Sequence, residues 1–248
     1  MRYLLKICYD GTLYSGYQRQ MNADTVGQRM FDALKKLFGS IQNMAGCSRT
    51  DSGVHANAFY ITFDADLERD CVQIIKALNA ILPVDIAVID CCSVLPDFHA
   101  RYNCLGKQYV YQIWNNKQRN PFYARYSLHV PYKINIVALN SIATDIVGTH
   151  DFSSFMASGS KIIDCVRTVT DAHFERNGDL IQFYVSANGF LYNMVRIMVG
   201  TFLDIEAGRL NKSVPYIIHG RSRAYAGHTA AAHGLFLNKV FYDESIKI

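Results

Sequence analysis

The sequence has no long apolar run, and this absence argues against a membrane protein. No apolar stretch approaches the ~20 residues that a membrane-spanning helix needs. The first apolar stretch, MRYLLKICYDG, is interrupted by Lys6 and ends at Asp10, which is not the pattern of a secretory signal peptide. We therefore expect a soluble, cytoplasmic protein with no signal peptide and no membrane partner.

Cofactor and metal motifs are also missing. The chain has seven cysteines but no C-x-x-C pair, and the adjacent Cys91 and Cys92 are too close together for the usual zinc-ligand spacing. Free thiols in a reducing cytosol explain this odd number best, and a structural zinc site is the alternative. The sequence contains neither a G-x-G-x-x-G fingerprint nor a P-loop. We therefore expect no cofactor and no metal.

The composition is that of a globular protein with a mildly basic charge. Hydrophobic residues make up 50% of the chain and charged residues 19%, so a large core can be buried. The net charge of +4 permits nucleic-acid binding without requiring it. A length of 248 residues fits one large or two modest domains. We place the boundary between residues 1–97 and residues 98–248, although no Ser- or Pro-rich linker separates these halves.

Hydrophobic periodicity predicts strands and helices that follow one another along the chain. Thr25 is placed to cap the first helix and Gly39 to end it, and Asn177-Gly178 signals a β-hairpin. The predicted strands cover residues 3–9, 58–64, 85–93, 107–114, 166–174, 180–186 and 235–242. The predicted helices cover residues 26–38, 71–82, 134–147 and 188–206, and a short one follows residue 215. This order is typical of an α+β fold with helices over a sheet face.

Residues 45–59, AGCSRTDSGVHANAF, differ from the rest of the chain. Asp51 lies in a cluster of Arg, Thr, Ser and Gly residues that predicts a loop leading into a strand. Loops held on a rigid scaffold often carry catalytic residues. On these residues alone, a turn aspartate whose carboxylate caps nearby N–H groups is the simpler interpretation.

The string GCSRTDSGVHA resembles the catalytic loop of the tRNA pseudouridine synthase A family. Other segments that resemble this family follow in the expected order, and Tyr17, Ala231 and His233 depart from its more usual Trp, Pro and Glu. The resemblance therefore covers nearly the whole chain. Its further segments are DGTLYSGYQRQ at residues 10–20, FHARY at 98–102, YVY at 109–111, HDFSSF at 150–155, NGFLYNMVRIMVG at 188–200 and AGHTAAAHGLFL at 226–237.

The resemblance implies a pseudouridine synthase fold, which is a mostly antiparallel curved sheet flanked by helices, with two similar halves around a central cleft. It also implies isomerisation of uridine to pseudouridine in the anticodon stem-loop of tRNA, at positions 38 to 40, by a homodimer. The isomerisation moves one glycosidic bond without redox change, so it implies no cofactor.

Two other classes of function remain to be weighed. A non-catalytic protein that binds structured RNA would not need Asp51 and Arg196 together. A glycoside hydrolase would need a second carboxylate, and none stands out near the loop.

The resemblance gives single residues their roles. Asp51 corresponds to the catalytic nucleophile, Arg196 to the arginine that pairs with it, and Tyr109 to the tyrosine that stacks on the target base. Arg196 is also the only charge in its apolar segment, which suggests a buried anionic partner. A long side chain that reaches the surface is the alternative for Arg196, and a half-buried sheet residue is the alternative for Tyr109.

Further basic and aromatic residues are candidates for RNA contact. The resemblance implies that Arg49, Arg101 and Leu235 hold the target uridine, which must leave its stack to reach the carboxylate. Arg101 taken alone is equally compatible with an exposed side chain. Residues 115–126, NNKQRNPFYARY, interleave cations with rings, as RNA contact or a plain long connection would allow. The weaker candidates for RNA binding are Arg19, Lys117, Arg119 and Arg125.

Overall fold

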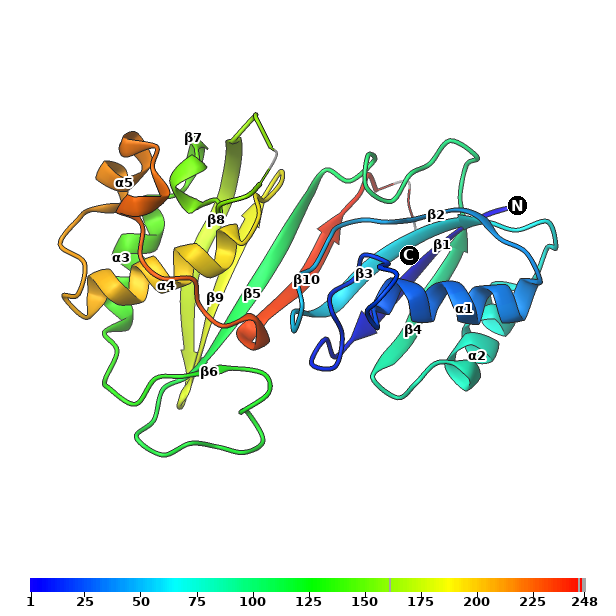
Figure 1. The fold of residues 1–248 in the computed structure, drawn as a ribbon, viewed down its shortest axis with the longest axis horizontal. Coiled ribbons are helices and arrows are strands. Elements are labelled where there is room, and N and C mark those ends of the chain that lie inside the picture. The colour runs from blue at the N-terminus through cyan, green and yellow to red at the C-terminus, as the bar shows by residue number, and fades with distance from the viewer. Residues whose placement is uncertain (161, 245, 247–248) are drawn as a thin grey trace. The chain divides into compact units, whose positions relative to one another are not determined.

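The computed structural model describes residues 1–160, 162–244 and 246. It divides into two compact units: unit 1 holds residues 1–105 and the described residues from 236 onward, and unit 2 holds residues 106–235. The described residues form ten strands and five α-helices, which confirms the α+β class with mostly antiparallel strand pairing (Figure 1). The boundary predicted at residues 97 and 98 lies in the loop before unit 2, and the return of the C-terminal residues to unit 1 was not predicted.

Unit 1 is built around the strand β3 (His55–Asp64). One edge of β3 pairs antiparallel with β1 (Arg2–Tyr9), which pairs antiparallel in turn with β4 (Ile86–Ser93). The other edge of β3 pairs antiparallel with β2 (Gln42–Gly46) and parallel with β10 (Leu235–Phe241). The strand next to Asp51 is therefore held by the first and the last strands of the chain.

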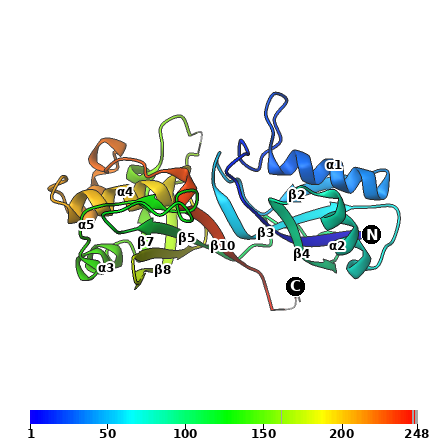
Figure 2. The same ribbon diagram turned by 90° about the horizontal axis from the view of Figure 1, so that it is seen from below.

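Two helices complete unit 1. Helix α1 (Val26–Phe38) begins at Thr25, whose side chain accepts a hydrogen bond from the Gln28 N–H, and it ends at Gly39 with a positive φ of 77°. Helix α2 (Cys71–Ile81) begins at Asp70, whose carboxylate caps two N–H groups. The two helices pack on each other, and α2 packs on β4 (Figures 1 and 2). Both predicted helices are confirmed.

Unit 2 is an antiparallel sheet in the order β5, β9, β8, β7. These strands are β5 (Gly106–Trp114), β9 (Leu180–Ala187), β8 (Val166–Asn177) and β7 (Gly148–Asp151), and the short β6 (Leu128–His129) runs parallel to β5. Gly178 has a φ of 59° in the turn between β8 and β9, so the predicted hairpin is confirmed.

Helices α3 (Ile136–Thr144), α4 (Met194–Glu206) and α5 (Val214–Gly220) belong to unit 2. The Asn140 side chain ties α3 to the backbone of Phe174 in β8, and Phe202 of α4 packs edge-on against Phe183 at 5.6 Å. The prediction that α4 starts at residue 188 was wrong. Asn193 is in a left-handed conformation, φ 59°, so the helix begins after it.

Candidate active site

Asp51 lies on the loop between β2 and β3, here called the Asp51 loop (residues 47–54), as the sequence predicts. Cys47 fixes the start of the loop, because its N–H donates to the Tyr60 carbonyl at 2.8 Å and its Sγ accepts from the Tyr60 N–H at 3.3 Å. Near its end the Val54 N–H donates to the Asp51 carbonyl at 3.1 Å. Asp51 itself is half-buried. The backbone that carries the carboxylate is therefore fixed at both ends.

A second segment, residues 9–17, packs against this loop. The Tyr9 and Thr50 hydroxyls share a buried hydrogen bond of 2.7 Å, and the Tyr17 N–H donates to the Thr50 carbonyl at 3.2 Å. Gly16 has a φ of +84°, and a Cβ there would lie 2.4 Å from the Thr50 oxygen. The approach is possible only because residue 16 is glycine. The residue before Asp51 is thus held from its side chain and from its carbonyl.

His55, at the start of β3, is a site-supporting residue that the sequence reasoning missed. It is fully buried, and its Nδ1 accepts from the Gly11 N–H at 3.0 Å and lies 3.1 Å from an Asp10 carboxylate oxygen. Its ring stacks on Phe236 at 4.5 Å. The signal was present in the GVHA end of the loop motif. His55 ties the first turn after β1 to the strand that follows the Asp51 loop.

Three of the predicted arginines come together in one pocket of unit 1, here called the arginine pocket. Arg19, Arg49 and Arg101 all line this cavity of about 230 Å³. All three side chains are exposed at its rim. The Arg19 guanidinium lies 3.9 Å above the Phe31 ring and donates to Gln28 at 2.9 Å, so its position is fixed.

His99 also lines the arginine pocket, and it is neutral at physiological pH. Burial, together with Arg2 and Arg101, lowers the pKa of the imidazole below its usual value. Nδ1 of His99 accepts hydrogen bonds from the N–H groups of Arg101 and Tyr102, at 3.0 and 3.4 Å, which requires an unprotonated Nδ1. His99 therefore orders the FHARY loop instead of adding charge to the pocket.

Tyr109 and Tyr111 lie in β5, as the sequence predicts. Tyr111 is fully buried and donates to the Ala231 carbonyl at 2.8 Å, so it is a core residue. Tyr109 is 7% exposed, and its ring meets Phe190 edge-on at 4.9 Å. Both are buried more deeply than the half-buried alternative supposed. Leu235, at the first position of β10, is 6% exposed.

Arg196 lies in the first turn of α4 and is half-buried. Its Nε donates to the Ala230 carbonyl at 2.7 Å, and its Nη1 donates to the Asn193 side chain at 2.7 Å. The Ala230 N–H donates back to the Arg196 carbonyl at 3.0 Å. These contacts within unit 2 fix the guanidinium on the segment around residue 230, and they make a freely snorkelling side chain the wrong interpretation. Its predicted pairing with Asp51, which belongs to unit 1, stays a prediction.

The predicted RNA-contacting residues of unit 2 lie on the basic–aromatic loop (residues 115–126). Lys117, Arg119 and Arg125 are all exposed, and Phe122 is 85% exposed. The loop also has a buried side, because Tyr123 stacks on Trp114 at 4.8 Å, with an angle of 14° between the rings. One aromatic residue of the loop is therefore a buried anchor, while Phe122 and the cations face solvent, and RNA contact by this loop stays a prediction.

Comparison with known proteins identifies the family. A family model described as tRNA pseudouridine synthase matches residues 142–243. The tRNA pseudouridine synthase A of Thermoanaerobacter sp. (strain X514) is 42% identical over 240 residues, which are 96% of this chain and 98% of that protein. The chain belongs to the tRNA pseudouridine synthase A family.

Other members of the family match equally well. The tRNA pseudouridine synthase A of Halalkalibacterium halodurans is 42% identical and covers 93% of this chain and 89% of its own length. The tRNA pseudouridine synthase A of Streptococcus equi subsp. equi is 41% identical, over 98% of this chain and 99% of its own length. Among solved structures, a Cbf5-Nop10-Gar1 complex matches with a TM-score of 0.35 and 11% identity, over 97% of this chain and 50% of that one. That likeness is too slight to add to the assignment.

Ala231, where the resemblance leads one to expect proline, has a φ of −59°, a value that proline also adopts. The Ala231 carbonyl accepts a hydrogen bond from the Tyr111 hydroxyl, which fixes the backbone of the segment before β10.

Neither a metal site nor a membrane-spanning helix is found among the described residues. Within residues 1–160, 162–244 and 246, no group of three His, Cys, Asp or Glu side chains is arranged to hold a metal ion. No helix in the described part of the chain has the length and apolar character needed to cross a bilayer.

Proposed function

We propose that this member of the family isomerises uridine to pseudouridine at positions 38 to 40 of the tRNA anticodon stem-loop, with Asp51 as the nucleophile. The family assignment makes the chain a tRNA pseudouridine synthase, an isomerase, and it favours this function over the non-catalytic alternative. The observation that carries the proposal is the Asp51 loop. It contains the sequence RTDSGVHA, and residues 9–17 hold its backbone through hydrogen bonds to Thr50.

The reaction defines what the site must supply. The N1–C1′ bond of the uridine breaks, the base turns, and C5 bonds to C1′, while the proton on C5 moves to solvent and N1 gains one. Neither redox change nor hydrolysis takes place. One ionised carboxylate is needed as nucleophile, and an aspartate is ionised at neutral pH. Because the loop backbone is already fixed, the Asp51 carboxylate can be positioned without any ordering of the loop when substrate binds.

The other residues take supporting roles in the proposal. Arg196 orients the Asp51 carboxylate and keeps it ionised, and Tyr109 stacks on the target base, where stacking is worth about 1–3 kcal/mol. Arg49, Arg101 and Leu235 hold the flipped nucleotide. The weaker RNA contacts come from Arg19, Lys117, Arg119 and Arg125. We further propose a cytoplasmic homodimer across which the tRNA lies, and sedimentation with and without tRNA tests its stoichiometry.

The deciding experiment is to map pseudouridine by chemical labelling in unmodified tRNA treated with wild-type protein or with Asp51→Asn. We expect modification at positions 38 to 40 by the wild type. In the variant, turnover falls by about 10⁴-fold or more while the Kd for tRNA stays the same, because the shape is kept and the nucleophile is lost. Modification at other positions would overturn the assigned target. Full activity of Asp51→Asn would overturn the assigned nucleophile.

The role of Arg196 has its own test. Arg196→Met keeps an unbranched apolar stem but removes the guanidinium and its hydrogen bonds to Ala230 and Asn193. We expect activity and stability to fall together, with a stability loss of about 2–4 kcal/mol. Urea unfolding and single-turnover kinetics measure the two effects. A stable variant with normal turnover would show that the guanidinium acts on neither the fold nor the carboxylate.

A further inference from the structure

Arg196 is held by an irregular backbone segment, residues 226–231, here called the Ala230 segment. The Arg196 Nε donates to the Ala230 carbonyl at 2.7 Å, so the position of this carbonyl sets the direction of the guanidinium. Because the segment is neither helix nor strand, its path is set by the contacts that it makes with other elements. Those contacts are therefore part of what positions Arg196.

The Ala230 segment follows one face of α4. At one end, the Ala230 N–H donates to the Arg196 carbonyl at 3.0 Å. One turn further along the helix, a Cβ on Gly200 would lie 2.0 Å from the His228 carbonyl oxygen, so only glycine permits this approach. The backbones of the helix and the segment are thus in direct contact, and the segment has no room to move closer to the helix.

Two side chains of α4 bind the other end of the segment. Thr201 is fully buried, and its hydroxyl accepts from the Gly227 N–H at 2.9 Å and donates to the Ile197 carbonyl at 2.7 Å. In the next turn, one carboxylate oxygen of Asp204 accepts from the His228 N–H at 3.2 Å and from its Nδ1 at 2.8 Å. His228 is therefore held both by its backbone and by its ring.

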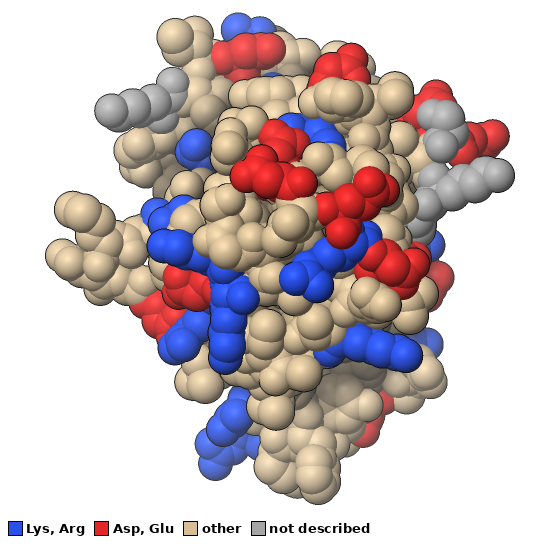
Figure 3. Space-filling model, turned by 90° about the vertical axis from the view of Figure 1, so that its right-hand side faces the viewer, with Lys and Arg blue, Asp and Glu red and all other residues tan. Residues whose placement is uncertain are grey.

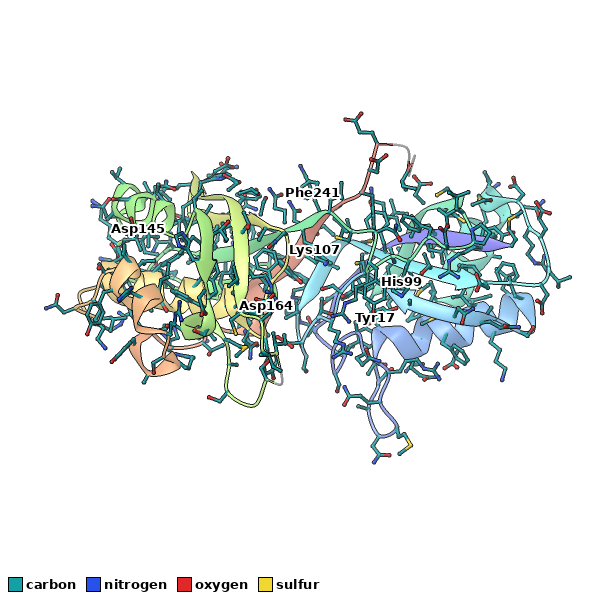
Figure 4. All side chains as sticks on the ribbon, turned by 90° about the horizontal axis from the view of Figure 1, so that it is seen from above. Tyr17, His99, Lys107, Asp145, Asp164 and Phe241 are labelled. Carbon is teal, nitrogen blue, oxygen red and sulfur yellow. The ribbon has the colours of Figure 1, made fainter. Side chains whose placement is uncertain are left out.

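The Asp204 carboxylate differs from an ordinary surface charge. Figure 3 shows a face on which acidic and basic side chains are interspersed, and exposed pairs of that kind contribute little. Asp145, labelled in Figure 4 at the end of α3, is likewise exposed. The Asp204 side chain is only 15% exposed, and its second oxygen accepts from the Arg209 Nε at 2.8 Å. Burial raises the pKa of Asp204, but hydrogen bonds from His228 and Arg209 outweigh burial, so the pKa lies below its usual value and the group is ionised.

We propose that Asp204 and His228 are positioning residues for the reaction. Their hydrogen bond fixes the path of the Ala230 segment, and the Ala230 carbonyl in turn orients the Arg196 guanidinium. The inference rests on the proposed function in that Arg196 has to act on the Asp51 carboxylate. A hydrogen bond to a charged group is stronger than a neutral one, which suits it to hold a backbone segment in one place. A displacement of about 1 Å at a reacting group can cost about 10²-fold in rate, so a small shift of the segment matters.

The test replaces the His228 ring by side chains that differ in one donor. In His228→Asn the amide nitrogen is as many bonds from Cβ as Nδ1 of histidine, so it can still donate to Asp204, whereas His228→Leu has no donor. We expect His228→Leu to lower the single-turnover rate of pseudouridine formation in unmodified tRNA about tenfold, with the Kd for tRNA unchanged. His228→Asn should restore the rate to within about twofold of wild type.

Asn140→Ala is the control for stability alone. The Asn140 side chain makes two hydrogen bonds to the Phe174 backbone, at 2.6 and 2.9 Å, and ties α3 to the sheet of the same unit. We expect its thermal midpoint to fall by a few degrees, while its turnover stays at the wild-type value at a temperature where the protein is fully folded. Equal losses of turnover in Asn140→Ala and His228→Leu would overturn the proposal, because a general loss of stability would then explain both.

A double-mutant cycle with Arg196→Lys tests whether His228 acts through Arg196. Lysine keeps the charge but lacks the Nε that donates to Ala230. We expect His228→Leu to slow the wild type but to have little further effect on Arg196→Lys. Additive losses would overturn the proposal, because His228 would then act by another route.

The same measurements separate this inference from the proposed function. Wild-type turnover of His228→Leu beside slow turnover of Arg196→Met would contradict the positioning role alone. Wild-type turnover of Arg196→Met would contradict the proposed role of Arg196 and the positioning role with it. The rate is measured at whichever uridine is modified, so the test does not depend on positions 38 to 40.

Discussion

The Asp51 loop and the basic–aromatic loop are both irregular and both carry polar residues, yet the structure holds them in different ways. The Asp51 loop is fastened along its length by residues 9–17, with a buried hydroxyl pair at 2.7 Å and a glycine that admits a close backbone approach. The basic–aromatic loop is fastened by Trp114 and Tyr123 and by bonds at its ends, while its cations and Phe122 face solvent.

The difference follows from what each loop has to do. A nucleophile has to stand within a fraction of an ångström of its productive position, so its backbone must be ordered before substrate arrives. Contacts to phosphate and to unstacked bases depend mainly on charge and on an accessible ring face, and they tolerate some movement. Changes that loosen the first loop should therefore act on turnover, and changes to the second should act on affinity.

Among the changes that test this comparison of the two loops, the largest effect is expected from Gly16→Ala. The new methyl group meets the Thr50 carbonyl at 2.4 Å, and the positive φ adds about 1–2 kcal/mol of strain. Gly39→Ala is the matched control, because Gly39 also has a positive φ of 77° but nothing within 4 Å of its Cβ. We expect Gly16→Ala to lose about 1–3 kcal/mol more stability than the control and about 10²-fold in turnover.

Urea unfolding and single-turnover rates measure both of these variants. Equal stability losses at the two glycines would mean that the approach of residue 16 to the Asp51 loop is not tight, and the comparison between the two loops would fail.

An intermediate effect is expected from Thr50→Val, which keeps the shape of the side chain and removes the hydrogen bond to Tyr9. The stability loss should be about 1 kcal/mol, and turnover should fall about tenfold because the residue before Asp51 is less well held. A double-mutant cycle with Tyr9→Phe isolates the coupling between the two hydroxyls. Lower stability with unchanged turnover would show that this bond supports the fold but does not aim the carboxylate.

The smallest effect is expected from Arg119→Ala in the basic–aromatic loop. The tRNA Kd should rise a few-fold at moderate salt, and the salt slope should fall by about 0.7–0.9, while turnover at saturating tRNA stays unchanged. Lys36→Ala, an exposed cation on α1, is the control that removes the same charge elsewhere. An unchanged slope for Arg119→Ala would make the loop a structural connection.

Much of this fold could be predicted from local sequence. The Thr25 cap, the Gly39 stop, the Asn177-Gly178 turn and the alternation in β5 each specify a local conformation, and the structure has all four. The strands β2, β6 and β7 were not predicted, and the start of α4 was misplaced. β2 reads QNMAG, with no alternation and a residue at positive φ, so only its pairing with β3 makes it a strand. The apolar residues just before α4 suggested that the helix starts at residue 188. Phe190 in fact lies in a loop, and its ring packs on Tyr109.

The site could be predicted in part. The motif strings located Asp51, Arg196 and Tyr109, and the basic strings located the arginines. Neither could show that Arg19, Arg49 and Arg101 share one cavity, since that depends on contacts between segments far apart in sequence. The burial of the Tyr17 hydroxyl, which has no hydrogen-bond partner among the described residues, could not be predicted either, because it depends on the packing around the ring.

The return of the chain to unit 1 has a consequence for biosynthesis. Unit 2 is one continuous stretch, so all of its strands have left the ribosome while the C-terminal segment is still being made. Unit 1 must wait for β10, whose residues pair with the start of β3 more than 170 positions earlier, at Phe236↔His55. His55 stacks on that same Phe236. The end of β3 nearest the Asp51 loop is therefore completed only after the whole of unit 2 has been synthesised.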